Sequence, residues 1–167
     1  MRVVGIDPGI KTTGYGIVEG RGSAFSLVEA GIVSTRERDD MPTRIRNLYD
    51  DILALFKDAR ADVTAIEKLY AHYAHPRTAI LMAHARGAIL LAAAQCGVPV
   101  ASYSPNLIKQ SLTGNGHASK SQMQQMIQVM LGLHAPPEPP DVADALAVAL
   151  CHLNTVDRPA AIGRRRT

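Results

Sequence analysis

The chain has 167 residues, of which 47% are hydrophobic and 20% charged, and its formal net charge is +3. This length and composition fit one globular domain that can fold without disulfides or structural metals. Cys96 and Cys151 match neither a disulfide framework nor a zinc site, and buried free thiols suit a reducing cytoplasm. The longest uncharged apolar stretch, residues 87–94, is shorter than the ~18–20 residues of a membrane span. We therefore expect a cytoplasmic protein without a membrane partner.

The first third of the chain predicts three strands followed by a helix. The predicted strands are apolar or β-branched segments at residues 3–7, 12–18 and 25–34. The spacers between them are short enough for antiparallel hairpins. Apolar side chains then recur at helical spacing through residues 41–56.

The rest of the chain alternates strands with helices. Short β-branched segments predict strands at residues 63–67 and 98–103. Helical patterns and helix-start residues predict helices at 76–95, 104–112 and 119–131, and from the proline-rich hinge 136–140 to about Leu153. The strand at 63–67 should lie parallel to the first strand, because a helix precedes it. This order predicts an α/β fold with a mixed five-stranded sheet flanked by helices, and ligand sites at the carboxyl ends of the parallel strands.

Four acidic residues lie at the ends of these apolar elements. Asp7 ends the first predicted strand, and Glu67 ends the fourth. Asp141 and Asp144 project from one side of the last helix, at its start. Each acid also has a structural explanation of its own: Asp7 before Pro-Gly can form a turn, Glu67 can pair with a base such as Lys68, and acids favour helix starts.

Taken together, the four acids predict a metal site. Two like charges 4 Å apart repel by about 4 kcal/mol at an effective dielectric near 20, and bound cations relieve that repulsion. Ligands that are all oxygen favour Mg²⁺ or Mn²⁺. Two such ions can activate a water and stabilise the leaving oxygen of a phosphoryl transfer. The sequence thus predicts a metal-dependent enzyme.

Basic and aromatic residues near these acids are candidate nucleic-acid contacts. Lys109 follows a helix start, and Lys120 opens a helix after a glycine-rich loop, where phosphate contacts are common. Tyr70 and Tyr73 follow Glu67 in a polar segment and could stack on unpaired bases, with Arg77 close behind. The alternatives are solvated lysines and tyrosines that anchor the loop to the domain.

In this order the motifs resemble the RuvC family of Holliday-junction resolvases, bacterial endonucleases with an RNase H-like fold. The resemblance runs from residue 2 to about residue 153 and rests on residues 5–9, 13–16, 65–67, 85–87, 109–110, 120–122 and 141–147. Lys68 and Tyr70 depart from it, since an uncharged residue and a phenylalanine are expected there. We expect an RNase H-like nuclease domain at residues 1–153 and a basic, flexible tail at 154–167.

The resemblance implies a function and roles for the candidate residues. The catalytic, metal-binding acids would be Asp7, Glu67, Asp141 and Asp144. Lys109 and Lys120 would contact DNA near the scissile phosphate, and Tyr70 would replace an aromatic that stacks on junction bases. The resemblance also implies a homodimer that nicks two opposed strands of a four-way junction with Mg²⁺, using two ions per site. It would work beside the branch-migration proteins RuvA and RuvB, and the helix containing Arg86 and Gly87 would form the dimer contact.

Three other functions fit parts of the sequence. The hairpin around residues 7–16 resembles the phosphate-binding hairpin of sugar kinases and actin-like ATPases, but that fold needs a second half that this chain lacks. A junction-binding protein without catalysis would not need all four acids. Another RNase H-like nuclease with a different nucleic-acid substrate is the strongest alternative.

Overall fold

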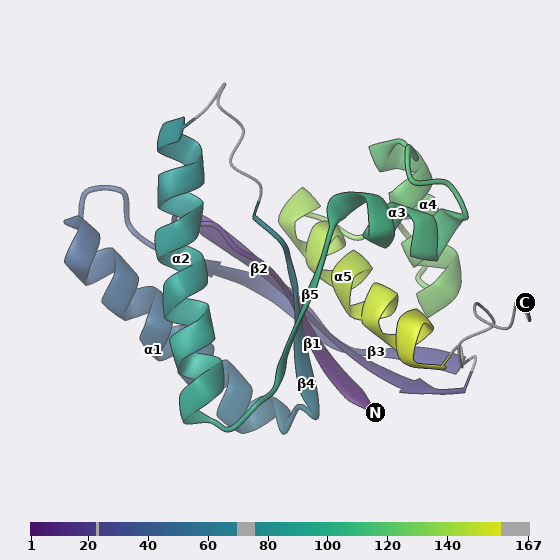
Figure 1. Cartoon of the computed structure of the whole chain (residues 1–167), viewed down its shortest axis with the longest axis horizontal. Helices are drawn as coiled ribbons and strands as arrows, with labels where there is room; N and C mark the ends of the chain where they lie inside the picture. Colours follow the sequence, from purple (N-terminus) through teal and green to yellow (C-terminus); the bar gives the residue numbers. More distant parts are fainter. Residues whose placement is uncertain (23, 70–75, 158–167) are drawn as a thin grey trace, which may run out of the picture.

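The sheet has three parallel strands on one side and an antiparallel hairpin on the other. The computed structural model describes residues 1–22, 24–69 and 76–157. The strands are β1 (Arg2–Asp7), β2 (Thr12–Arg21), β3 (Ala24–Ser34), β4 (Val63–Glu67) and β5 (Val100–Tyr103), in the order β3-β2-β1-β4-β5 (Figure 1). β1, β4 and β5 pair in parallel, and β1, β2 and β3 pair antiparallel. The predicted mixed five-stranded sheet is confirmed, and β2 runs three residues further than predicted because its last residues still pair with the start of β3.

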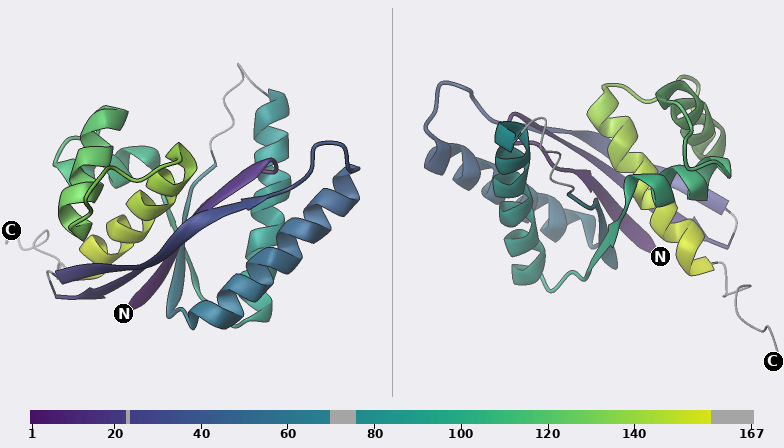
Figure 2. Two further views of the ribbon diagram at one scale, coloured as in Figure 1. Left: turned by 180° about the vertical axis from the view of Figure 1, so that it is seen from behind. Right: turned by 45° about the horizontal axis from the view of Figure 1, so that its top comes forward.

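Five helices cover the two faces of this sheet. They are α1 (Met41–Ala59), α2 (Pro76–Gln95), α3 (Pro105–Thr113), α4 (Lys120–Leu131) and α5 (Pro140–Asp157). α1 and α2 lie on one face and α3, α4 and α5 on the other, as the views of Figure 2 show. Strand alternation supplies both cores: Val3 packs into the core beneath α5, and Val4 packs into the core beneath α1.

Two helices extend beyond their predicted ends. α1 continues to Ala59 and stops where Arg60 adopts a left-handed conformation, with φ of 48°. α5 continues to Asp157, four residues into the segment predicted as a tail. The sequence 154–157 contains neither glycine nor proline, so nothing in it stops the helix. Residues 158–167 lie outside the described residues.

Caps fix the starts of the two helices that carry the candidate lysines. The Ser104 hydroxyl accepts a hydrogen bond of 3.3 Å from the backbone amide of Leu107 at the start of α3. At the start of α4, Ser119 and Gln122 form a reciprocal capping box. Lys120 is therefore the first residue of a helix whose position is set by hydrogen bonds rather than by packing alone.

α2 has an apolar surface that the single chain leaves uncovered. Among the described residues, it is the one helix long and apolar enough to cross a membrane, with a mean hydropathy of 1.3 over its most apolar window. The uncharged apolar stretch counted from the sequence covers only residues 87–94, because Arg86 interrupts it. Arg86 is the only Asp, Glu, Lys or Arg between residues 78 and 95, so the helix as a whole is more apolar than that count indicated. Only 28% of that window is buried, and a core helix would be buried over most of its length. The exposed part of α2 is thus suited to a partner.

α5 lies unusually close to the sheet because glycines face it. A Cβ atom added at Gly5 in β1 would collide with the backbone carbonyl oxygen of Ala145. A Cβ added at Gly14 in β2 would collide in the same way with the carbonyl oxygen of Asp141. Neither obstacle is a side chain that could rotate away. The absence of side chains at these two positions therefore sets the separation of α5 from the sheet.

Gly5→Ala tests this close packing. The new methyl group must push α5 away from β1, and overpacking of this kind typically costs about 1–3 kcal/mol. We expect a decrease of at least about 2 kcal/mol in the free energy of unfolding, measured by urea denaturation. The matched control is Gly116→Ala, where the nearest atom would lie 3.5 Å away and the unfolding free energy should stay within about 0.5 kcal/mol. Equal stability of the two variants would contradict the assignment.

Candidate active site

Asp7 and Glu67 end two neighbouring parallel strands at the same edge of the sheet. β1 and β4 pair with Ile6 opposite Ile66, and both isoleucines are completely buried. The acids that follow them leave the sheet side by side and are half-buried. The sequence prediction that these two carboxylates meet at the carboxyl ends of parallel strands agrees with this geometry.

α5 brings the second pair of acids to the same edge. Gly14 pairs with Asp7 across β1 and β2, and the backbone of Asp141 lies directly over Gly14. Asp144 follows one turn later and lines the same two cavities as Glu67. Residues 145–153 of α5 are all buried and, apart from His152, apolar, so the first turn of the helix is where it presents carboxylates to the sheet edge.

Burial and mutual repulsion both act on these carboxylates. The pKa of Asp7 is raised to about 7, mainly by desolvation and further by repulsion from Asp144, Glu67 and Asp141. Desolvation also raises the pKa of Glu67, with a further contribution from the charge of Asp144. The pKa of Asp144 is raised mainly by desolvation. The four acids therefore interact electrostatically, as expected of the ligands of one cation-binding site.

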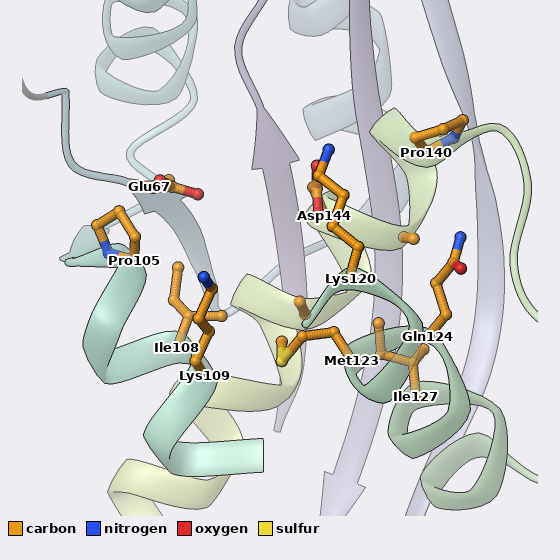
Figure 3. Close-up of a pocket in the computed structure, with 12 residues that line it drawn as sticks. Glu67, Pro105, Ile108, Lys109, Lys120, Met123, Gln124, Ile127, Pro140 and Asp144 are labelled. Atoms are coloured by element: carbon orange, nitrogen blue, oxygen red, sulfur yellow. The ribbon is translucent and has the colours of Figure 1, made fainter. Parts of the chain in front are cut away.

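Lys109 on α3 and Lys120 on α4 supply positive charge near the carboxylates. The charge of Lys120 opposes the increase in the pKa of Asp7 and of Asp144. Lys109 opposes it for Glu67 and for Asp144. Figure 3 shows both lysine side chains directed from α3 and α4 toward these carboxylates. Two lysines near four acids leave negative charge uncompensated.

Two cavities adjoin the carboxylates. One, of about 270 Å³, lies between α3, α4 and α5 and carries Lys109, Lys120 and Gln124 around an apolar floor (Figure 3). The other, of about 460 Å³, lies between Asp7 and the start of α2. Glu67 and Asp144 line both cavities, so the acids stand at their common border. A chain-like substrate could occupy both sides while its centre lies on the carboxylates.

The chemistry of the donor set fits a hard divalent cation. All four candidate ligands are carboxylates, and no hydrogen bond contributes to the shifted pKa values of Asp7, Glu67 or Asp144. Among the described residues, no three Asp, Glu, His or Cys side chains lie close enough together to hold a metal ion as they stand. Carboxylates that repel one another stay apart, and a cation between them would draw them together. The fit to Mg²⁺ or Mn²⁺ thus rests on oxygen ligands and uncompensated charge.

The remaining predicted contacts are placed only in part. Arg77 is exposed in the first turn of α2, next to Thr78, which lines the larger cavity. Tyr70 and Tyr73 lie outside the described residues. Their proposed contacts with bases stay predictions.

Two polar residues near the site were not singled out for it in the sequence. Gln124 lies one helical turn after Lys120 on the same side of α4, and that i,i+4 spacing could have identified it. Arg86 donates a hydrogen bond to the backbone carbonyl of Glu67. No sequence pattern signals that contact, because the acceptor is a main-chain atom in a distant strand.

Comparisons with known proteins agree on one family. The family model described as "Crossover junction endodeoxyribonuclease RuvC" matches residues 3–152. A protein of that name from Rhodopirellula baltica is 48% identical over 149 residues, which are 89% of this chain and 84% of the relative. Another from Caldicellulosiruptor saccharolyticus is 44% identical over 154 residues, 92% of each chain.

Solved structures give the same result. The structure described as "T. thermophilus RuvC in complex with Holliday junction substrate" superposes with a TM-score of 0.89 at 35% identity, covering 94% of this chain and 95% of that one. The yeast mitochondrial Holliday junction resolvase Ydc2 superposes with a TM-score of 0.67 at 17% identity, covering 92% and 78%. The second likeness concerns the fold alone.

The high pKa of Asp7 predicts an unusual pH dependence of stability. In metal-free protein the folded chain keeps a proton on Asp7 up to about pH 7, whereas the unfolded chain releases it near pH 3.8. The free energy of unfolding should therefore fall as the pH rises from 4 to 8, by up to about 4 kcal/mol for this group. Asp7→Asn should remove most of that decrease in urea titrations with EDTA. The exposed acid variant Asp58→Asn should keep the wild-type slope, and an unchanged slope in Asp7→Asn would refute the assignment.

Proposed function

The chain belongs to the RuvC family of crossover junction endodeoxyribonucleases, and from this we infer that it resolves four-way DNA junctions. It does so by metal-dependent hydrolysis of phosphodiester bonds in two opposed strands. One observation of this structure supports the reaction most directly: Asp7, Glu67 and the Asp141/Asp144 pair meet at one edge of the sheet, where desolvation and repulsion call for cations. A purely structural set of acids would be paired with bases or hydrogen-bond donors.

We propose that these four acids are the metal-binding catalytic residues. Two Mg²⁺ ions, replaceable by Mn²⁺, would supply an activated water and stabilise the leaving oxygen of the phosphodiester that is cleaved. Asp7 and Glu67 present their carboxylates from the rigid ends of buried strands. Asp141 and Asp144 approach from α5 on the other side. Because these acids come from elements buried in the core, the backbone positions that carry them are set before the substrate binds.

The neighbouring basic residues would hold the DNA. Lys109 and Lys120 border the smaller cavity and are suited to the phosphates on either side of the scissile bond. Lys120 opens α4, so the free amides at that helix end add to its attraction for a phosphate. Tyr70, Tyr73 and Arg77 would contact bases and phosphates near the centre of the junction.

The exposed face of α2 would form a two-fold homodimer. Ile80 and Leu91 are 58% and 54% exposed, and a Cβ atom added at Gly87 between them would meet nothing. Such an apolar strip with a small residue at its centre allows two helices to cross closely. A C2 dimer presents two equivalent active sites, which matches the approximate two-fold symmetry of a four-way junction.

The cellular setting is also a proposal. The free cysteines Cys96 and Cys151 suit the reducing cytoplasm, where chromosomal recombination takes place. Membership of the family supports cooperation with the branch-migration proteins RuvA and RuvB. A pull-down of purified RuvB by this protein on junction DNA tests that partnership.

Cleavage of three synthetic substrates tests the reaction. The protein should cut a four-way junction in Mg²⁺ or Mn²⁺, should leave plain duplex and RNA–DNA hybrid largely intact, and should stop in EDTA. Asp7→Asn should lower the cleavage rate by at least about 10³-fold, because it removes a ligand from the proposed metal site. Binding of the junction in a gel-shift assay should stay within a few-fold of wild type.

The matched control for charge removal is Asp58→Asn on the exposed side of α1, which should cut at the wild-type rate. Undiminished cutting by Asp7→Asn would rule out the metal site. Preferential cutting of the RNA–DNA hybrid would instead identify a different RNase H-like nuclease.

The dimer can be tested on the face of α2. Leu91→Glu places a charge twice in the proposed interface, which should weaken dimerisation by about 10³-fold or more at about 2 kcal/mol per site. Analytical ultracentrifugation should show monomers, and a junction in a supercoiled plasmid should receive single rather than paired nicks. Val129→Glu, at a position that is 75% exposed on α4, should remain dimeric. A dimeric Leu91→Glu protein would exclude this face.

A further inference from the structure

Arg86 connects α2 to the strand that ends in a catalytic acid. Its Nη1 atom donates a hydrogen bond of 2.6 Å to the backbone carbonyl oxygen of Glu67, and its Nη2 atom donates one of 2.9 Å to the hydroxyl of Ser102. Glu67 is the last residue of β4, and Ser102 lies in β5. One guanidinium group thus bridges two adjacent strands at their carboxyl ends.

Neither acceptor of this arginine carries a charge. Among the described residues, the salt bridges join other groups: Arg2 to Glu19, Lys11 to Glu37 and Arg46 to Asp50. Arg86 is half-buried, and this burial lowers the pKa of its guanidinium. A desolvated cation without a carboxylate partner is costly to stability. The two hydrogen bonds of this planar guanidinium fix the direction of the Glu67 carbonyl group.

Holding this carbonyl fixes the backbone from which the side chain of Glu67 projects. The next amide, of Lys68, donates a hydrogen bond of 2.7 Å to the carbonyl oxygen of Tyr103 in β5. The peptide unit after Glu67 is therefore held at its oxygen by α2 and at its nitrogen by the neighbouring strand. With this peptide plane fixed, the direction in which the Cα–Cβ bond of Glu67 leaves the backbone is also fixed.

We propose that Arg86 is a positioning residue that fixes the backbone from which the Glu67 carboxylate projects and couples it to the position of α2. This inference rests on the proposed function, in which Glu67 binds metal and another face of α2 contacts the second subunit. Arg86 and Gly87 are consecutive residues, and consecutive side chains of a helix point about 100° apart. One turn of α2 therefore presents Arg86 to the end of β4 and Gly87 to the proposed interface. A change in the position of α2 would reach Glu67 through the guanidinium.

The prediction concerns metal binding first and cleavage second. In Arg86→Gln the shorter side chain cannot donate to the Glu67 carbonyl and to Ser102 together, so the backbone of Glu67 is released and its carboxylate can leave the ligand position. We expect Mn²⁺ affinity, measured on the full chain by isothermal titration calorimetry, to fall by about 5- to 20-fold. At saturating junction and standard Mg²⁺, kcat should fall by about 10- to 100-fold, since misplacement by about 1 Å costs that much. KM for the junction should stay within about twofold.

Two further variants separate positioning from folding. Arg86→Lys keeps the charge and can donate to one acceptor, so it should recover part of the Mn²⁺ affinity. Ser102→Ala removes only the second acceptor and should stay within about threefold of wild type. Arg46→Gln, which removes an exposed arginine from α1, is the control for loss of a positive charge and should leave Mn²⁺ affinity and kcat unchanged.

The outcomes distinguish this inference from the proposed function. Wild-type Mn²⁺ affinity in Arg86→Gln would overturn the positioning role, whether or not the protein cuts junctions. A fall in Mn²⁺ affinity that matches a fall in the folded fraction, measured by thermal unfolding, would also overturn it. Failure of the wild-type protein to cut any junction would refute the proposed function, and the Mn²⁺ comparison would still decide the role of Arg86.

Discussion

The active site depends on how closely α5 can approach the sheet. Glycines at positions 5 and 14 leave the surface of β1 and β2 without side chains, and the backbone of α5 occupies that space. An ordinary residue at either position would lift the helix and carry Asp141 and Asp144 away from Asp7. The packing that holds the domain together is therefore the same packing that assembles the carboxylates. Stability and function share one contact here, so neither can be changed alone.

This contact forces like charges together, and the rest of the structure has to tolerate them. Three of the four carboxylates carry raised pKa values, mainly because they are desolvated, so in metal-free protein they reduce the stability of the fold at neutral pH. The compensation comes from two aliphatic cores, one on each face of the sheet. Lys109 and Lys120 offset part of the repulsion without pairing tightly with any acid. A site left short of positive charge in this way keeps its affinity for cations and for phosphates bridged by them.

The sequence predicts the parts of this design that local patterns encode. Alternation and helical spacing locate the strands and helices, and acids at the ends of apolar segments identify Asp7 and Glu67. The close contact of α5 is not visible in the same way, since Gly5 and Gly14 lie inside predicted strands and the local pattern does not show which helix faces them. The role of Arg86 is hidden for a similar reason: its acceptor is a carbonyl group, and every residue has one. Patterns of side chains predict which groups do chemistry, whereas contacts with the backbone decide how those groups are held.

The strand that carries Glu67 is held from both faces of the sheet. On one face, Arg86 ties its end to α2. On the other, its neighbour β5 is tied to α5 through Tyr103, whose hydroxyl lies 2.7 Å from Nδ1 of the buried His152. His152 lies two turns after Asp144 on the same helix, so this hydrogen bond connects the strand pair of Glu67 to the helix of Asp144. The residues that carry the carboxylates of the sheet and of α5 thus belong to one hydrogen-bonded network. Through Arg86 that network extends to α2, where a second subunit would bind.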